Sequence, residues 1–75
     1  MLRKRLSAEE AAIGVLKTFK LAANRYWLTA RSAKFVDEAN HFVEDYESGR
    51  EIDWTSVLDL IVNFHTEMGE WIGSH

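Results

Sequence analysis

The chain has 75 residues, no cysteine, no proline and a formal net charge of −3. Its length predicts one domain, residues 1–75, with a small hydrophobic core, and the lack of cysteine excludes disulfides and thiolate metal sites. Glycine is also sparse and no stretch shows the alternation of a β-strand, so the fold class that we expect is all-α.

The first predicted helix covers about residues 8–30. Ser7 and Glu10 have the spacing of a capping box, and Leu6 and Ala11 occupy the two positions of a hydrophobic staple. The basic residues before Ser7 do not predict a signal peptide, because Glu9 and Glu10 interrupt the apolar stretch that would have to follow. One face of this helix is apolar and is expected to enter the core: Ala12, Val15, Phe19, Ala22 and Tyr26.

A second helix is predicted for about residues 33–48, and it ends at Ser48 and Gly49 because glycine readily adopts the left-handed conformation. Its apolar face consists of Phe35, Ala39, Phe42, Val43 and Tyr46. On one straight helix the first and second apolar faces would point in nearly opposite directions. We therefore expect a bend or turn near Thr29 and Ser32, either of which can cap a helix. The alternative is a continuous helix of about 40 residues, completed by a second chain into a dimeric helical bundle.

The third predicted helix covers about residues 54–70, after an N-cap at Asp53 and a staple between Ile52 and Val57. Gly69 and Gly73 are both plausible ends. Its apolar face consists of Trp54, Val57, Leu58, Ile61, Phe64, Met68 and Ile72, and His65 falls within it. We expect His65 to be buried in the core or an interface with a hydrogen-bond partner, or to form a pH-sensitive contact. Three such helices predict a three-helix bundle. The most apolar window of the chain, residues 57–64, is too short to cross a bilayer.

Charge is divided between the two halves of the chain. Eight of the nine basic residues precede Asp37, and ten of the twelve acidic residues lie at Asp37 or after it. This segregation is typical of charges that pair along the rims of a bundle, or between the chains of a head-to-tail or antiparallel dimer, where they set orientation.

Several large apolar residues lie away from the centres of the predicted core faces. Leu21 and Leu28 lie roughly opposite the first apolar face, and Trp27, Leu60 and Trp71 lie at the edges of the apolar faces of their own helices. The leucines are either covered inside a bundle that surrounds the first helix or form a second interface. The candidate partner interface consists of Leu21, Trp27, Leu28, Leu60 and Trp71.

A basic face on the first helix is the basis of an alternative function. Lysine and arginine would neutralise phosphates, and the nearby Trp27 would stack on a base. The acidic second half opposes contact with a polyanion, so nucleic acid is the less favoured partner. The candidate basic face consists of Lys17, Lys20, Arg31 and Lys34.

Nothing in the sequence predicts catalysis. Glu38 and His41 have the i, i+3 spacing of helical di-iron sites, but the further inward-facing glutamates of such sites are missing. We expect no catalytic residue, metal or cofactor, and no membrane partner. The sequence favours a cytoplasmic, homodimeric protein-interaction module that acts as an adaptor, inhibitor or regulatory subunit by binding a protein partner. The alternative is a nucleic-acid-binding regulator that uses the basic first helix.

Overall fold

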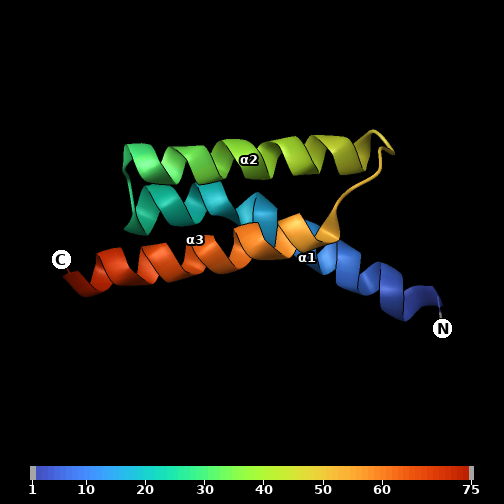
Figure 1. The fold of residues 1–75 in the computed structure, drawn as a ribbon, viewed down its shortest axis with the longest axis horizontal. Coiled ribbons are helices and arrows are strands. Elements are labelled where there is room, and N and C mark those ends of the chain that lie inside the picture. Colours follow the sequence, from blue (N-terminus) through green and yellow to red (C-terminus); the bar gives the residue numbers. More distant parts are fainter. Residues whose placement is uncertain (1, 75) are drawn as a thin grey trace.

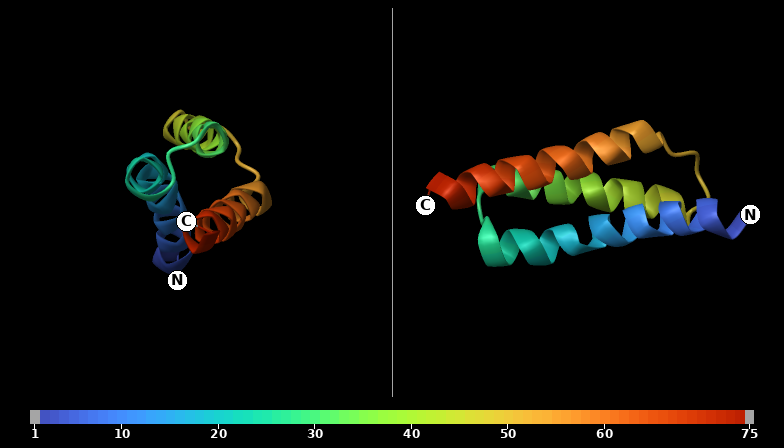
Figure 2. Two further views of the ribbon diagram at one scale, coloured as in Figure 1. Left: turned by 90° about the vertical axis from the view of Figure 1, so that its left-hand side faces the viewer. Right: turned by 90° about the horizontal axis from the view of Figure 1, so that it is seen from below.

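Three helices pack around one core in the computed structural model, which describes residues 2–74, with side chains from Ala8 to Ser74. They are α1 (Leu2–Tyr26), α2 (Ala30–Glu47) and α3 (Trp54–Ser74), and each runs antiparallel to the one before it (Figure 1). The predicted three-helix bundle is confirmed. The continuous-helix alternative is wrong, because the chain reverses direction between α1 and α2 (Figure 2). Within residues 2–74, none of the helices is long and apolar enough to cross a membrane.

The start of α1 differs from the prediction. The helix begins at Leu2, so Ser7 lies inside it instead of capping it. Leucine, arginine and lysine are strong helix formers, and no glycine or proline precedes Ser7 to stop the helix from extending toward the N-terminus. The side chains of Leu6 and Ser7, on which the predicted staple and capping box depend, lie outside the part of the chain whose side chains the structure describes.

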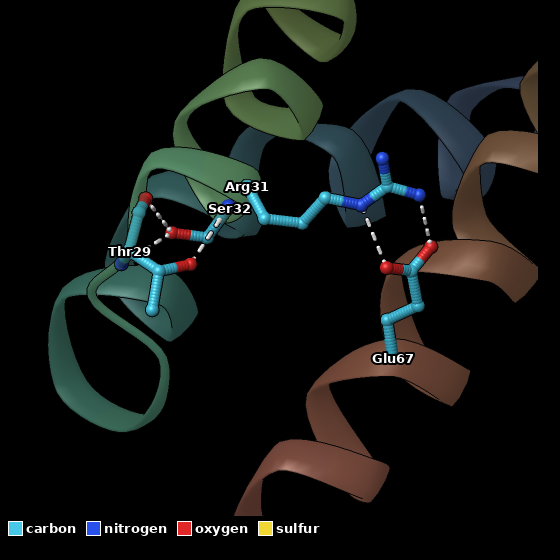
Figure 3. A network of polar contacts seen from close by, with 4 residues as sticks. All are labelled: Thr29, Arg31, Ser32 and Glu67. Atoms are coloured by element: carbon cyan, nitrogen blue, oxygen red, sulfur yellow. Dashed lines mark hydrogen bonds and ion pairs between the residues drawn. The ribbon is translucent and has the colours of Figure 1, made fainter.

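A capping box closes the turn between α1 and α2. The Thr29 hydroxyl oxygen accepts from the Ser32 backbone amide at 3.2 Å, and the Ser32 hydroxyl oxygen accepts from the Thr29 amide at 3.1 Å. The Ser32 hydroxyl also donates to the Thr29 carbonyl at 2.8 Å (Figure 3). Ser32 is only 1% exposed, so these bonds satisfy a polar side chain whose burial would otherwise be unfavourable. The two residues expected to cap a helix here cap it together.

The end of α2 agrees with the sequence prediction. Gly49 has φ +76°, the left-handed conformation expected just after a helix. Ser48 is the C-cap, and its backbone amide donates to the Glu44 carbonyl at 2.9 Å. A short link without regular secondary structure, residues 50–53, then leads to α3 (Figure 1).

The predicted N-cap of α3 is also present. The Asp53 carboxylate accepts from the backbone amides of Thr55 and Ser56 at 3.1 and 3.3 Å, and from the Ser56 hydroxyl at 2.9 Å. These bonds, the Ser56 hydroxyl foremost, hold the pKa of Asp53 below its ordinary value. At its other end α3 continues to Ser74, so neither Gly69 nor Gly73 stops it.

Aromatic rings form the centre of the core. Phe19 of α1 stacks on Phe64 of α3 with ring centroids 4.0 Å apart. Trp27 lies 5.7 Å from Phe35 and 5.8 Å from Phe64, so one cluster joins all three helices. The buried apolar residues are Ile13, Leu16, Phe19, Ala23, Trp27, Phe35, Ala39, Val57, Leu60 and Phe64.

The buried face of α1 is rotated from its predicted position. Of the predicted face only Phe19 is buried, while Tyr26 is 51% exposed and the rest are at best partly buried: Ala12, Val15 and Ala22. Ile13, Leu16, Ala23 and Trp27 are buried instead. The reason is that α1 packs more closely on α2 than on α3, which buries the side of α1 turned toward α2.

The apolar faces predicted for the second and third helices are buried at their centres, as expected. On α2, Phe35 and Ala39 are buried and the remaining predicted residues are partly buried. On α3, Val57 and Phe64 are buried, but Leu58 and Ile72 are exposed, contrary to the prediction. Leu60 takes a place in the core that had been expected for Leu58, because the α3 side that carries Leu60 also faces α2.

Candidate interaction surfaces

Two residues of the candidate partner interface are accessible to a partner. Leu21 and Leu28 are 74% and 76% exposed, so the bundle does not cover them. Trp27 and Leu60 were expected at edges but lie in the core, at 4% and 5% exposure. Trp27, which follows the end of α1, packs against Phe35 of α2 and Phe64 of α3, and Leu60 lies on the side of α3 that faces α2. Trp71 is partly buried and lines, with Trp27, a depression of about 390 Å³.

Basic side chains flank the exposed leucines. Lys17, Leu21 and Arg25 follow one another at intervals of one helical turn on α1, and Leu28 follows in the link after the helix ends at Tyr26. We refer to Lys17, Leu21, Arg25 and Leu28 as the leucine surface. The Lys17 ammonium lies 3.5 Å from the Glu47 carboxylate of α2, but both side chains are more than half exposed, and such pairs contribute little to stability.

A second group of exposed apolar side chains lies mainly along the outer side of α3. Leu58, Val62 and Ile72 of α3 are 58%, 60% and 49% exposed, and Tyr26 of α1 is 51% exposed. Tyr26 lies one heptad after Phe19, whose ring contacts α3, so it is on the same side of α1. We refer to Tyr26, Leu58, Val62 and Ile72 as the α1–α3 face.

The sequence contains a signal for the α1–α3 face that the prediction did not use. Six of the eight residues in 57–64 are large and apolar, which is a wider arc than a single buried stripe requires. Tyr26, Leu58 and Ile72 were assigned to the core because periodicity identifies apolar faces and not the elements that cover them.

His65 marks the contact between α1 and α3. It is exposed, so the expected burial in the core is wrong, while its Nδ1 has a polar neighbour 2.8 Å away in the Ile61 carbonyl of the preceding turn. Its ring meets Phe19 and Phe64 edge-on, with centroids 6.2 and 5.5 Å away. Leu58 and Ile72 each lie one heptad from His65, which places them on this same side of α3.

The candidate basic face is divided between separate parts of the surface. Lys17 and Lys20 are on α1, whereas Arg31 and Lys34 lie at the start of α2 and line a depression that also contains Glu38 and Glu67. These carboxylates would weaken contact with phosphates. The four residues therefore do not form the single basic face that the sequence predicted.

Arg31 is committed to an ion pair that joins α2 to α3. Its Nε and Nη2 donate to the two carboxylate oxygens of Glu67 at 2.7 and 2.8 Å (Figure 3). The guanidinium carbon also lies 5.4 Å from the centroid of the Phe35 ring. The hydrogen bond with Glu67 raises the pKa of Arg31, and the same bond lowers the pKa of Glu67.

The Glu38 and His41 pair lies further along the same α2–α3 side of the bundle. Both line a depression of about 400 Å³ between α2 and α3, together with Asp59 and Asn63. Over residues 2–74 no three side chains of histidine, cysteine, aspartate or glutamate are grouped closely enough to hold a metal ion. The carboxylates with lowered pKa, Asp53 and Glu67, act in a helix cap and an ion pair, which are structural contacts.

We compared the chain with protein-family models, with curated proteins and with solved structures, and no match was found in any of the three.

Proposed function

We propose that this chain is a small protein-interaction module, which associates with a second copy of itself and binds another protein as an adaptor, inhibitor or regulatory subunit. One observation carries the proposal. Six large apolar side chains are between 49% and 76% exposed in a chain of 75 residues: Leu21, Tyr26, Leu28, Leu58, Val62 and Ile72. Scattered apolar residues are ordinary on a protein surface, but these fall into two groups on defined sides of the bundle, as contact sites do.

The leucine surface is the part that we assign to the protein partner. Leu21 and Leu28 supply apolar contact, and Lys17 and Arg25 supply positive charge at its rim. No acidic residue lies between Glu10 and Asp37 in the sequence, so the charges that α1 itself contributes here are positive, and one acidic side chain of α2, Glu47, lies beside Lys17. A complementary partner would be an amphipathic segment with acidic side chains beside its apolar ones, since charge pairs at a rim favour encounter and orientation.

A capture experiment with source-cell lysate tests this proposal. The chain is immobilised as the natural sequence, as the double variant Leu21→Glu with Leu28→Glu, and as the control Asn40→Glu with His41→Glu, which adds two carboxylates at exposed positions of α2. We expect the natural chain and the control to retain the same protein partner, and the leucine variant to lose it. Capture of the same proteins by all three forms, or of none by any, would contradict the proposed partner surface.

A further inference from the structure

We propose that the end of the bundle beside the link between α2 and α3 binds a small molecule that carries a trimethylammonium group. The site is a depression of about 780 Å³, where the link lies beside the first half of α1 (Figure 2). Its walls include the rings of Tyr46, near the end of α2, and Trp54, the first residue of α3. The inference is independent of the proposed protein partner and of self-association.

Tyr46 and Trp54 form a corner of two aromatic walls. Their ring centroids lie 6.0 Å apart and their planes meet at 77°, so the rings are nearly perpendicular. Both side chains are partly buried and pack against the core, which holds them in place. Trp54 also lines a second depression of about 310 Å³, so its indole is accessible from more than one side. The negative π-faces of such rings attract a cation that lies in the corner between them.

The charged side chains around the corner also favour a cation. Glu51 and Asp53 of the link line the same depression. Among the described residues that line it, the one basic side chain is Arg50, which pairs at 3.1 Å with a carboxylate of α2. Glu9 lines the depression too, but Arg5 precedes it by one helical turn in the sequence and offsets its charge. The two carboxylates of the link therefore leave the depression negative.

A trimethylammonium group fits these surroundings better than a primary ammonium or a guanidinium. Its methyl groups donate no strong hydrogen bond, so it binds by contact with aromatic faces. A primary ammonium or guanidinium needs several acceptors for its N–H groups. The Asp53 carboxylate already accepts three hydrogen bonds at the start of α3, and Glu51 lies on an exposed link. The rings therefore contact the cation, while the carboxylates attract it through space.

The depression at the opposite end of the bundle does not offer the same site. It is lined by Trp27 and Trp71, but Trp27 is only 4% exposed. The Arg31 guanidinium lines it as well, and a fixed cation repels another cation. Accessible rings and negative surroundings are both needed, and the depression at Tyr46 and Trp54 combines them.

Proton NMR of choline mixed with the natural chain tests the site, because an aromatic face shifts the signal of methyl protons held against it. We expect a saturable upfield shift with a dissociation constant in the millimolar range. The neutral analogue 3,3-dimethylbutan-1-ol, in which carbon replaces the charged nitrogen, should bind roughly tenfold more weakly. Ethanolamine, the primary amine, should also bind more weakly. Absence of a saturable choline shift, or equal binding of either analogue, would overturn the inference.

Substitutions locate the site on the chain. Trp54→Leu and Tyr46→Leu should each weaken choline binding by roughly threefold or more, because each removes one aromatic face, whereas Tyr46→Phe should retain it. Tyr26→Leu is the matched control, since Tyr26 is an aromatic side chain that is 51% exposed elsewhere on the surface. Circular dichroism checks that each variant keeps its helices. Choline binding that survives both leucine variants, or that is lost with Tyr26→Leu, would place the site elsewhere and overturn the inference.

Glu51→Gln tests the carboxylates at little risk to the fold, because Glu51 is exposed on the link. It should weaken choline binding by about twofold at low salt and by less at high salt. Glu70→Gln is the matched control, since Glu70 is exposed near the opposite end of the bundle, and it should leave binding unchanged. Equal effects of the two substitutions would mean that the net charge of the chain attracts choline, and not this depression.

Further probes distinguish the sources of the trimethylammonium group. Glycine betaine and phosphatidylcholine vesicles carry it beside a negative group that the carboxylates repel, so betaine should bind more weakly than choline and the vesicles should not retain the chain. A peptide that contains trimethylated lysine should bind no more tightly than choline. Retention by the vesicles would assign the depression to a membrane surface, and tighter binding of the peptide would assign it to a modified protein. Either result overturns the assignment to a small molecule.

Discussion

The two neighbours of α1 are packed against it differently. On the side of α2, the chain reverses in a short turn with a satisfied capping box, and Ile13, Leu16, Ala23 and Trp27 are buried with the α2 side chains. On the side of α3, Phe19 and Phe64 stack, but Tyr26, Leu58, Val62 and Ile72 around that contact are largely exposed. One side of the helix is closed by the chain itself and the other is closed only at its centre.

This difference shows which apolar side chains the three helices can bury by themselves. Three helices of these lengths surround one row of large side chains, and Phe64 at its centre contacts Phe19, Trp27 and Phe35. The apolar arc of α3 is wider than that row, so its outer part has no covering element within residues 2–74. The exposed part of the arc is one of the two apolar surfaces on which association would act.

The largest expected loss of stability comes from a substitution at the centre of the core, which contacts both α1 and α2. Phe64→Ala should lower the free energy of unfolding by about 3–5 kcal/mol, because Phe64 is fully buried and its removal leaves a cavity among three aromatic rings. Urea unfolding followed by circular dichroism measures the change. Phe64→Leu keeps most of the buried volume and should lose less, which keeps the comparison measurable if the alanine variant is unfolded. A loss below about 1 kcal/mol in Phe64→Ala would contradict its central position.

The α1–α2 side of the bundle can be destabilised at the turn that joins these two helices. Ser32→Ala should lower the free energy of unfolding by about 1–2 kcal/mol, because the Thr29 backbone amide, at a partly buried position, loses the buried Ser32 hydroxyl as its acceptor. Ser48→Ala is the matched control, since Ser48 is exposed and caps α2 through its backbone amide. Equal losses in the two variants would show that the side-chain cap does not stabilise the turn.

Local signals in the sequence predicted most of the fold. Gly49, Asp53 and the Thr29 and Ser32 pair were identified correctly because caps and left-handed glycines depend on a few neighbouring residues. The periodicity of apolar residues gave the three helices in the right order. The start of α1 was missed because a good capping box does not stop strong helix formers from continuing past it.

The candidate surfaces were harder to predict because exposure depends on how helices pair. For Leu21 and Leu28 the sequence left open whether the bundle covers them or leaves them exposed, and the structure leaves both exposed. Trp27 and Leu60 were expected at edges but are buried, because the position of α2 relative to the other two helices depends on tertiary packing. A small rotation of a helix about its axis is enough to exchange core and edge positions. The same rotation exposes Tyr26 and Leu58. The pairing of Arg31 with Glu67, which are 36 residues apart, has no local signal.

The exposed apolar side chains of α3 can be shortened with little effect on the stability of the isolated chain. Leu58→Ala and Val62→Ala should each change the free energy of unfolding by less than about 0.5 kcal/mol at low protein concentration, because these side chains are largely exposed there. At high concentration the natural chain should gain stability from the proposed self-association. Thermal unfolding over a range of concentrations measures both effects. A loss above about 1 kcal/mol at low concentration would mean that the α1–α3 face already supports the single chain.

The smallest expected effect concerns the third side of the bundle, where the Arg31–Glu67 pair joins α2 to α3. The hydrogen bond from Arg31 lowers the pKa of Glu67 in the folded chain, so the folded state takes up a proton less readily than the unfolded state. Its contribution to stability is therefore complete above the ordinary carboxyl pKa, near 4, and is lost as the pH falls through the lowered value. In Glu67→Gln the stability should decline less between neutral and acidic pH than in the natural chain.

The partner variant distinguishes the pair from a general effect of acid. Arg31→Gln should flatten the acid profile to the same extent as Glu67→Gln, and the double variant should flatten it no further, because both changes remove one shared interaction. High salt should weaken the effect in the natural chain, since both side chains are accessible to solvent. Additive effects of the two substitutions would show that Glu67 and Arg31 act on acid stability through different partners. In that event the ion pair would not be the source of the acid sensitivity on the α2–α3 side.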